Sequence, residues 1–343
     1  MAQGDLPLVG ITMGDPAGIG PEIVSKALAG DAVRRVCRPL VIGDARIMTA
    51  ALALQPSSLK IRAVKSPAEA GFEPGTIEVL DLQNIAPEDF EQGRVNTSCG
   101  KAFVEYIRHS ARLALAGEID AIASAPTNKE AMHAAGQYYP GQTEIFAEEC
   151  GVKQPFTVLT GGHMRVFLLS SHVSLRQAIE LVRQERVESV IRQADAALRE
   201  LWGVDRPRIV VAGLNPHAGD GGLFGREEID EVIPVVERLR AEGFSLDGPG
   251  PADSVYHAAD RGNYDAVIGM YHDQGVIPLK RYGYVTVIAG TSIIRTTAGH
   301  GTAYDIAWKG VGRADIMARA IMLAAELAEL RKARLQAAKA AAE

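Results

Sequence analysis

The sequence has little of what defines several protein classes. Only three of its 343 residues are cysteine, they lie far apart and no CxxC pair occurs, so we expect neither a zinc ribbon nor a disulfide framework. Aromatic residues make up 6%, which argues against a stacking platform for single-stranded nucleic acid. No apolar run reaches the roughly 20 residues of a membrane span, and no apolar leader follows Met1. We therefore expect a cytoplasmic protein with reduced cysteines and no membrane partner.

The chain also lacks an excess of positive charge. It has 36 Lys and Arg residues against 42 Asp and Glu residues, a net charge of −6, so no global basic field for nucleic acid exists. Hydrophobic residues at 47% and charged residues at 23% are close to the globular average and exclude a disordered chain. The length predicts about two domains, and no low-complexity linker separates them.

Short apolar runs alternate with helical segments along the chain. We expect buried strands over 8–12, 40–42, 121–123, 166–169, 209–212, 266–270 and 285–288. We expect helices from about Pro21 to Leu28, from a cap at Thr97 or Ser98 to Leu115, and over 316–343, where the last residues fray. Strands that are apolar throughout and alternate with helices predict an α/β fold whose mainly parallel sheet is covered on both faces.

A glycine-rich segment, Gly14–Ile23, lies between the first strand and the first helix. Its three glycines would let a ligand approach a helix N-terminus. The spacing is not G-x-G-x-x-G, so an ordinary Rossmann fingerprint is not supported. A structural turn and a binding loop both stay open for this segment.

Three histidines stand directly after or beside expected strands. They are His172 in SSH, His217 in NPHAG and His272 in YHDQG. Open α/β sheets place their sites at strand C-terminal ends, and imidazole is a common ligand of transition metals. The separations of 45 and 55 residues carry little weight, so unrelated surface histidines remain the alternative. His109 and His133 lie in helical stretches and are expected to be structural.

Cationic and hydroxyl side chains supply a further element. Lys280 closes the segment after His272, and Arg295 is expected to follow a short strand. Such groups suit a phosphate or a carboxylate, although each alone also fits an ordinary surface charge. The later segment HGTAYDIA, from His300, is expected to enter a helix that Thr302 caps.

Taken together, these motifs resemble the 4-hydroxythreonine-4-phosphate dehydrogenase family. The resemblance lies in Gly14–Ile23 and in the segments 215–219, 271–275 and 300–303, in the same order, and runs from about residue 7 to 325. The first and last segments are also similar to the GDGIGPEI and HGSAPDIAG signatures of isocitrate and isopropylmalate dehydrogenases.

The resemblance implies an architecture. It implies two α/β/α lobes around a central cleft, as in isocitrate and isopropylmalate dehydrogenases, and a homodimer with shared active sites. We place the first lobe at 1–125 plus 283–343, and the second, with the histidines and the dimer contacts, at 126–282. It also implies binding of NAD without an ordinary Rossmann domain.

The resemblance further implies a site. A divalent metal, with Zn, Mg, Mn and Co all open, would be held by His172, His217 and His272, one of them from the partner subunit. Asp253, an acidic residue near the reacting centre, and Lys280 would be the catalytic residues, with Asp253 or a metal-linked water as the base. The resemblance assigns substrate binding to Gln142, Thr143, Lys280, Thr286 and Arg295, and cofactor binding to His300 and Gly301.

The implied reaction is oxidation with decarboxylation of 4-phosphohydroxy-L-threonine to 3-amino-2-oxopropyl phosphate, a step of pyridoxal phosphate synthesis. Gln142 replaces the family's usual histidine, Thr286 stands where asparagine is frequent, and the loop 281–284 is short. These departures leave open 4-phospho-D-threonate, 4-phospho-D-erythronate or an aromatic cis-dihydrodiol carboxylate as substrate. A catalytically silent metal- or nucleotide-binding protein is the alternative of another class.

Overall fold

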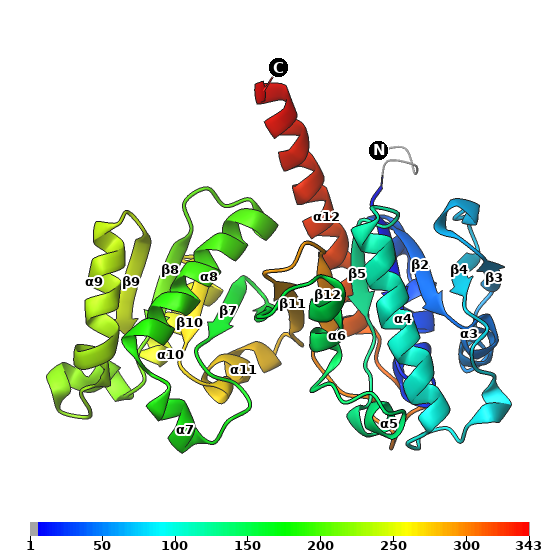
Figure 1. Cartoon of the computed structure of the whole chain (residues 1–343), viewed down its shortest axis with the longest axis horizontal. Coiled ribbons are helices and arrows are strands. Elements are labelled where there is room, and N and C mark those ends of the chain that lie inside the picture. The colour runs from blue at the N-terminus through cyan, green and yellow to red at the C-terminus, as the bar shows by residue number, and fades with distance from the viewer. Residues whose placement is uncertain (1–5, 343) are drawn as a thin grey trace. The chain divides into compact units, whose positions relative to one another are not determined.

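The computed structural model describes residues 6–342 and divides the chain into two compact units (Figure 1). Unit 1 takes in the described residues up to Pro155 together with Thr291–Ala333. Unit 2 takes in Phe156–Gly290 and the residues from Arg334 onward. The expectations about an N-terminal leader and about the last residue, Glu343, fall outside the described residues.

Unit 1 contains a parallel sheet in the order β3-β4-β2-β1-β5-β12. Its strands are β1 (Leu8–Thr12), β2 (Arg38–Gly43), β3 (Lys60–Val64), β4 (Thr76–Asp81), β5 (Ala121–Ser124) and β12 (Arg295–Ala298). The central strands are buried along their whole length, because helices cover both faces of a parallel sheet. Arg295 is the first residue of β12, whereas we expected it to follow a strand.

The two helices that the sequence predicted before residue 155, at 21–28 and 97–115, form in unit 1 with small differences at their ends, and further helices lie between and after them. They are α1 (Gly20–Ala29), α2 (Asp31–Arg34), α3 (Ala45–Leu52), α4 (Thr97–Leu115), α5 (Lys129–Ala134) and α6 (Gln142–Glu149). The cap of α4 is Asn96, not Thr97 or Ser98, because the Asn96 Oδ1 atom accepts from the Cys99 amide at 3.1 Å.

The close packing of α5 on α4 explains why residues 126–155 belong to unit 1. A Cβ atom at Gly100 of α4 would lie 2.0 Å from the carbonyl oxygen of Ala131 in α5, so only glycine permits this approach. Helix α6 packs against α4 as well. The division of the chain thus differs from the expected one at residues 126–155, at 283–290 and after 333.

Unit 2 contains a mixed sheet in the order β11-β6-β7-β10-β8-β9, in which β6 runs antiparallel to both neighbours. Its strands are β6 (Phe156–Gly161), β7 (Met164–Leu168), β8 (Arg208–Ala212), β9 (Ser245–Gly250), β10 (Ala266–Gly269) and β11 (Val285–Ala289). Its helices are α7 (Leu175–Glu180), α8 (Gln184–Trp202), α9 (Ile233–Ala241), α10 (Ala252–Asp260) and α11 (His272–Lys280). The predicted α/β class is therefore confirmed, with β6 as the exception to a parallel order.

Two further segments bear on the predictions. No helix begins at Thr302: residues 304–310 form turns, because Ala303 and Trp308 have left-handed φ angles of +45° and +63° that a helix cannot contain. The last helix, α12 (Asp315–Ala342), forms as expected, and Leu335 near its end is 60% exposed. Across residues 6–342, the helices fall short of the length and apolarity that crossing a membrane would require.

Candidate functional site

The predicted site residues form two groups, one in each unit. Unit 1 holds the residues expected to bind substrate anions and the cofactor: Gln142, Thr143, Arg295, His300 and Gly301. Unit 2 holds the expected metal ligands and three other polar residues: His172, His217, His272, Asp253, Lys280 and Thr286.

Arg295 is a buried cation that the protein does not neutralise. Its side chain is 1% exposed, and its Nε donates to the Ser124 hydroxyl at 3.1 Å. Its Cζ lies 5.1 Å from the centre of the Phe146 ring, and its Nη2 has no hydrogen-bond partner among the described residues. Burial lowers the pKa of Arg295 to about 9, and nearby Glu144 opposes that shift. The group therefore stays charged at pH 7, with one donor nitrogen unused.

Helix α6 brings its first turn to the same part of unit 1. Phe146 and Glu144 of this helix lie near Arg295, and Gln142 and Thr143 are its first two residues. Gly141 precedes them without a side-chain cap, and the buried Gln142 Oε1 atom has no hydrogen-bond partner within residues 6–342. An uncapped helix N-terminus next to an unpaired guanidinium suits a phosphate or a carboxylate.

The turn at His300 and Gly301 follows β12. The His300 Nδ1 lies 3.0 Å from the Gly301 carbonyl oxygen. A Cβ atom at Gly301 would meet nothing within 4 Å, and the φ angle of this residue is not left-handed. The fold gives no reason for glycine here, whereas a ligand that approaches the backbone closely would. The turn therefore fits the expected binding of a dinucleotide.

In unit 2, the structure brings together two of the three predicted histidines. The ring centres of His172 and His272 are 5.7 Å apart. Two imidazoles that bind one Zn²⁺ tetrahedrally have centres about 5 Å apart, so this pair fits a shared metal. The His272 Nδ1 lies 2.8 Å from the Asp273 carboxylate, which in the neutral ring fixes the proton on Nδ1 and leaves Nε2 free to bind a metal.

His217 is not grouped with that pair. Within residues 6–342, no three His, Cys, Asp or Glu side chains stand together as a possible metal site. His217 begins a run of left-handed residues in η4 (Pro216–Gly222), with φ +55° at His217, +53° at Ala218 and +43° at Asp220. Three non-glycine residues in this conformation cost free energy, and such strain concentrates at functional sites.

Gln274 ties two of the histidine-bearing turns together. Its Oε1 accepts from the Met270 amide at 2.7 Å, and its Nε2 donates to the Gly213 carbonyl at 2.8 Å. Met270 precedes His272 by two residues, and Gly213 lies four residues before His217. One side chain thus fixes the spacing between the ends of β10 and β8.

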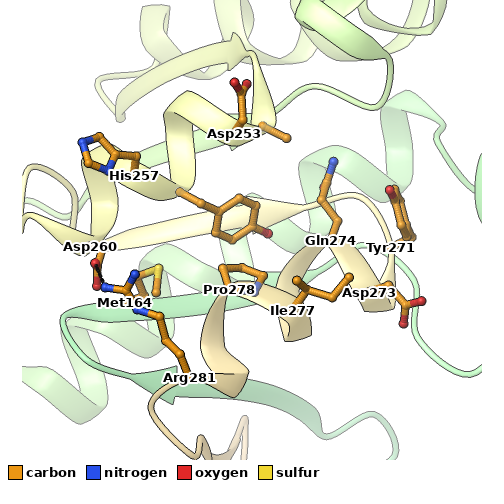
Figure 2. A pocket seen from close by; sticks show the side chains of 12 residues that line it. Met164, Asp253, His257, Asp260, Tyr271, Asp273, Gln274, Ile277, Pro278 and Arg281 are labelled. Atoms are coloured by element: carbon orange, nitrogen blue, oxygen red, sulfur yellow. Dashed lines mark hydrogen bonds and ion pairs between the residues drawn. The ribbon is translucent and has the colours of Figure 1, made fainter.

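A cavity of about 420 Å³ lies between α10 and α11 of unit 2 (Figure 2). Asp253 and His257 line it from α10, and Gln274, Ile277 and Pro278 line it from α11. Asp253 is exposed in the first turn of α10, so its carboxylate is accessible as a base.

The remaining two predicted residues of unit 2 lie in separate elements. Lys280 ends α11, is exposed, and places its Nζ 5.5 Å from the centre of the Tyr284 ring. Thr286 lies in β11 and is partly buried.

Sequence reasoning missed three residues around this cavity. Gln274 and Asp273 belong to the YHDQG motif, and their position next to His272 could have identified them as site residues. Tyr256 also lines the cavity; no group in the described part of the chain pairs with its buried hydroxyl, and burial raises its pKa. No sequence pattern marks it.

Comparison with known proteins gives consistent matches over most of the chain. The family model described as pyridoxal phosphate biosynthetic protein PdxA matches residues 35–324. The D-threonate 4-phosphate dehydrogenase of Cupriavidus necator is 44% identical over 330 residues, which cover 95% of this chain and 98% of that protein. The 4-hydroxythreonine-4-phosphate dehydrogenase of Trichlorobacter lovleyi is 44% identical over 331 residues, with the same coverage of both.

A solved structure agrees. The crystal structure of the 4-hydroxythreonine-4-phosphate dehydrogenase of Klebsiella pneumoniae has a TM-score of 0.86 and 45% identity, and the match covers 94% of this chain and 99% of that one. The motif resemblance is thereby confirmed. Two differently named activities are equally similar in sequence, so identity alone does not choose between their substrates.

Proposed function

We propose that this chain, which belongs to the family of the pyridoxal phosphate biosynthetic protein PdxA, oxidises and decarboxylates a phosphorylated hydroxy acid with NAD and a divalent metal ion. The leading substrate is 4-phosphohydroxy-L-threonine, which would become 3-amino-2-oxopropyl phosphate. The same chemistry on 4-phospho-D-threonate or 4-phospho-D-erythronate is the second candidate, favoured by the D-threonate 4-phosphate dehydrogenase of Cupriavidus necator.

The observation that carries this proposal is the unused donor of Arg295. A buried guanidinium without a carboxylate partner is costly, and a dianionic phosphate would supply the missing acceptor. The first turn of α6 in the same unit would add backbone donors, and Lys280 of unit 2 stays a substrate-binding residue by the family resemblance. A dianionic phosphate would meet this need better than the single carboxylate of an aromatic cis-dihydrodiol, which favours a phosphorylated substrate.

His172, His217 and His272 would hold the metal. When bound, such an ion lowers the pKa of a substrate hydroxyl and stabilises the negative charge that develops as carbon dioxide leaves. Asp253 would take the hydroxyl proton, because its exposed carboxylate lines the cavity that Gln274 also lines. The turn at His300 and Gly301 would hold NAD, which accepts the hydride.

A homodimer with shared sites would supply the third ligand that one chain does not group with the other two. Exposed apolar side chains accompany all three histidines: Val173 adjoins His172, Phe224 packs edge-on to His217, and Ile277 lies in the helix that His272 begins. Large exposed apolar side chains of this kind are typical of protein interfaces.

Replacing Gln274 with methionine tests whether its two side-chain hydrogen bonds position the histidine-bearing turns. We expect Gln274→Met to weaken metal binding about 10- to 100-fold, as for other side chains that support metal ligands. Titration of the purified protein with Zn²⁺ against a competing chelator measures this. Gln193→Met in α8, which loses a contact to Ser189 instead, should leave the affinity unchanged. Equal metal affinity in both variants would contradict the role of Gln274.

A substrate panel tests the proposed function. We expect metal-dependent formation of NADH at 340 nm from phosphorylated substrates and none from a cis-dihydrodiol carboxylate. Preference for 4-phosphohydroxy-L-threonine would place the protein in pyridoxal phosphate synthesis, and preference for 4-phospho-D-threonate would make it catabolic. The panel also addresses the silent alternative: a higher melting temperature with NAD and metal, but no NADH from any substrate, would contradict the dehydrogenase proposal.

A further inference from the structure

The segment 300–312 is held to the glycine-rich segment 14–26 of the same unit by several hydrogen bonds. The Ile19 amide donates to the Thr302 carbonyl at 2.9 Å, and the Trp308 Nε1 donates to the Pro16 carbonyl at 2.9 Å. Further along, Glu22 and Lys26 of α1 bind the backbone of Gly310 and Gly312. His300 and Gly301, at the start of the segment, take part in none of the hydrogen bonds that the described residues form between the two segments.

One contact in this set joins two ionisable groups. The Tyr304 hydroxyl donates to the Asp15 Oδ2 at 2.6 Å, while the Asp15 Oδ1 accepts from the Ala17 amide at 2.9 Å. Asp15 is 0% exposed, and it forms no ion pair among the described residues. A carboxylate buried without a cation lowers stability, so the fold alone does not explain why it is present.

We propose that Tyr304 and Asp15 are positioning residues for the cofactor, which hold the turn at His300 and Gly301 in its binding conformation. Tyr304 lies three residues after Gly301 and acts through its hydrogen bond to Asp15. This inference rests on the proposed role of that turn in binding NAD. It also gives Gly14–Ile23 a function: the segment supports the cofactor turn and need not touch the cofactor itself.

Replacing Tyr304 with phenylalanine removes the hydrogen bond and keeps the ring. In the full-length, metal-loaded protein we expect the dissociation constant for NAD to rise about tenfold, as for loss of a hydrogen bond to a charged group. The KM for the phosphorylated substrate should stay within about twofold, because Arg295 and α6 are untouched. Isothermal titration with NAD and steady-state kinetics measure the two quantities.

Tyr106→Phe is the matched control. Tyr106 is a buried tyrosine of α4 in the same unit, and its hydroxyl donates to the Asn84 side chain at 2.8 Å. The control should lower the melting temperature without changing the affinity for NAD. In a Trp202→Phe background, the emission of Trp308 should shift to the red in Tyr304→Phe and stay unchanged in Tyr106→Phe.

The pH dependence gives a readout that a purely structural role would not produce. Burial raises the pKa of Asp15 from 3.8 to about 6, so its carboxylate is protonated as the pH falls below 6. The groups that face it are Tyr304 and, from α4, Cys99; Glu130 of α5 lies near Tyr304. We expect the affinity of the wild type for NAD to fall between pH 7 and 5.

Asp15→Asn separates this effect from that of other ionisable groups of the protein. The variant should bind NAD at pH 7 as weakly as the wild type does at pH 5. Because the raised pKa means that ionisation of Asp15 opposes folding above pH 4, Asp15→Asn should also raise the melting temperature at pH 7 but not at pH 4. Greater stability with weaker NAD binding is the signature of a positioning residue.

The outcomes separate the inference from the proposed function. A wild type that binds no NAD would overturn both. A wild type that binds NAD, with Tyr304→Phe and Asp15→Asn binding it equally well, would overturn the inference alone.

Discussion

Replacing Arg295 with methionine is expected to raise the melting temperature of the protein while it removes affinity for a phosphorylated substrate. The side chain is fully buried, and no described residue offers its Nη2 a hydrogen-bond acceptor. An unpaired buried charge costs roughly several kcal/mol, and methionine fills a similar space without it. Each kcal/mol recovered raises the melting temperature by about 2–4 °C for a unit of this size.

The effect on binding should be the opposite. Two charge-assisted hydrogen bonds to a phosphate are together worth about 3–6 kcal/mol, so the KM should rise about 100-fold or more. Scanning fluorimetry and initial-rate kinetics on one preparation measure both effects.

Arg46→Met is the contrasting variant. Arg46 pairs with Asp44, which is fully buried, at 2.8 Å, so its loss leaves a carboxylate unpaired and should lower stability with no change in KM. If Arg295→Met instead destabilised the protein and left the KM unchanged, Arg295 would be a structural residue and the proposed anion site would be lost.

Replacing His272 or His172 with alanine is expected to remove the metal and to lower kcat/KM by about four orders of magnitude or more. Their rings lie 5.7 Å apart, so loss of either should halve the coordination that this chain provides. His217→Ala should likewise remove the metal and abolish oxidation with the fold intact. Metal content by mass spectrometry and NADH formation measure the effect, with the exposed His163→Ala as control.

Mixing pairs of these inactive variants tests the shared site. If one ligand comes from the partner subunit, unfolding and refolding two variants together should restore about a quarter of wild-type activity for the pairs whose ligands come from different protomers. Mixtures of two variants whose replaced ligands come from the same protomer should stay inactive. Recovery in none of the three mixtures would contradict a site shared between subunits, and full metal retention in all single variants would contradict the three histidines.

The sequence predicted those strands that form continuous apolar runs, together with the histidine-bearing turns, because both depend on local patterns. Continuous apolar runs such as 8–12 form central strands, and the motif around His272 lies where such a strand ends. The edge strand Lys60–Val64 escaped prediction because its exposed face is polar and its pattern is weak.

The properties that make the site chemically unusual depend on contacts between distant residues. Ser124 and Arg295 are 171 residues apart, and Asp15 and Tyr304 are 289 apart. Neither the missing partner of Arg295 nor the burial of Asp15 leaves a local trace in the sequence. The helix expected at Thr302 failed for the same reason. The local sequence is typical of a helix start, but contacts to the segment 14–26 hold these residues in turns.

The discontinuity of unit 1 bears on how the protein is synthesised. Its sheet needs β12, which pairs with β5, yet the ribosome makes Ser124 171 residues before Arg295. At bacterial and eukaryotic elongation rates that interval is about 10–30 s, during which the edge of β5 is open to other chains. The main segment of unit 2, Phe156–Gly290, is synthesised before β12 emerges. The anion site is thus assembled last, and a nascent chain that stalls before residue 295 carries an exposed strand edge and no Arg295.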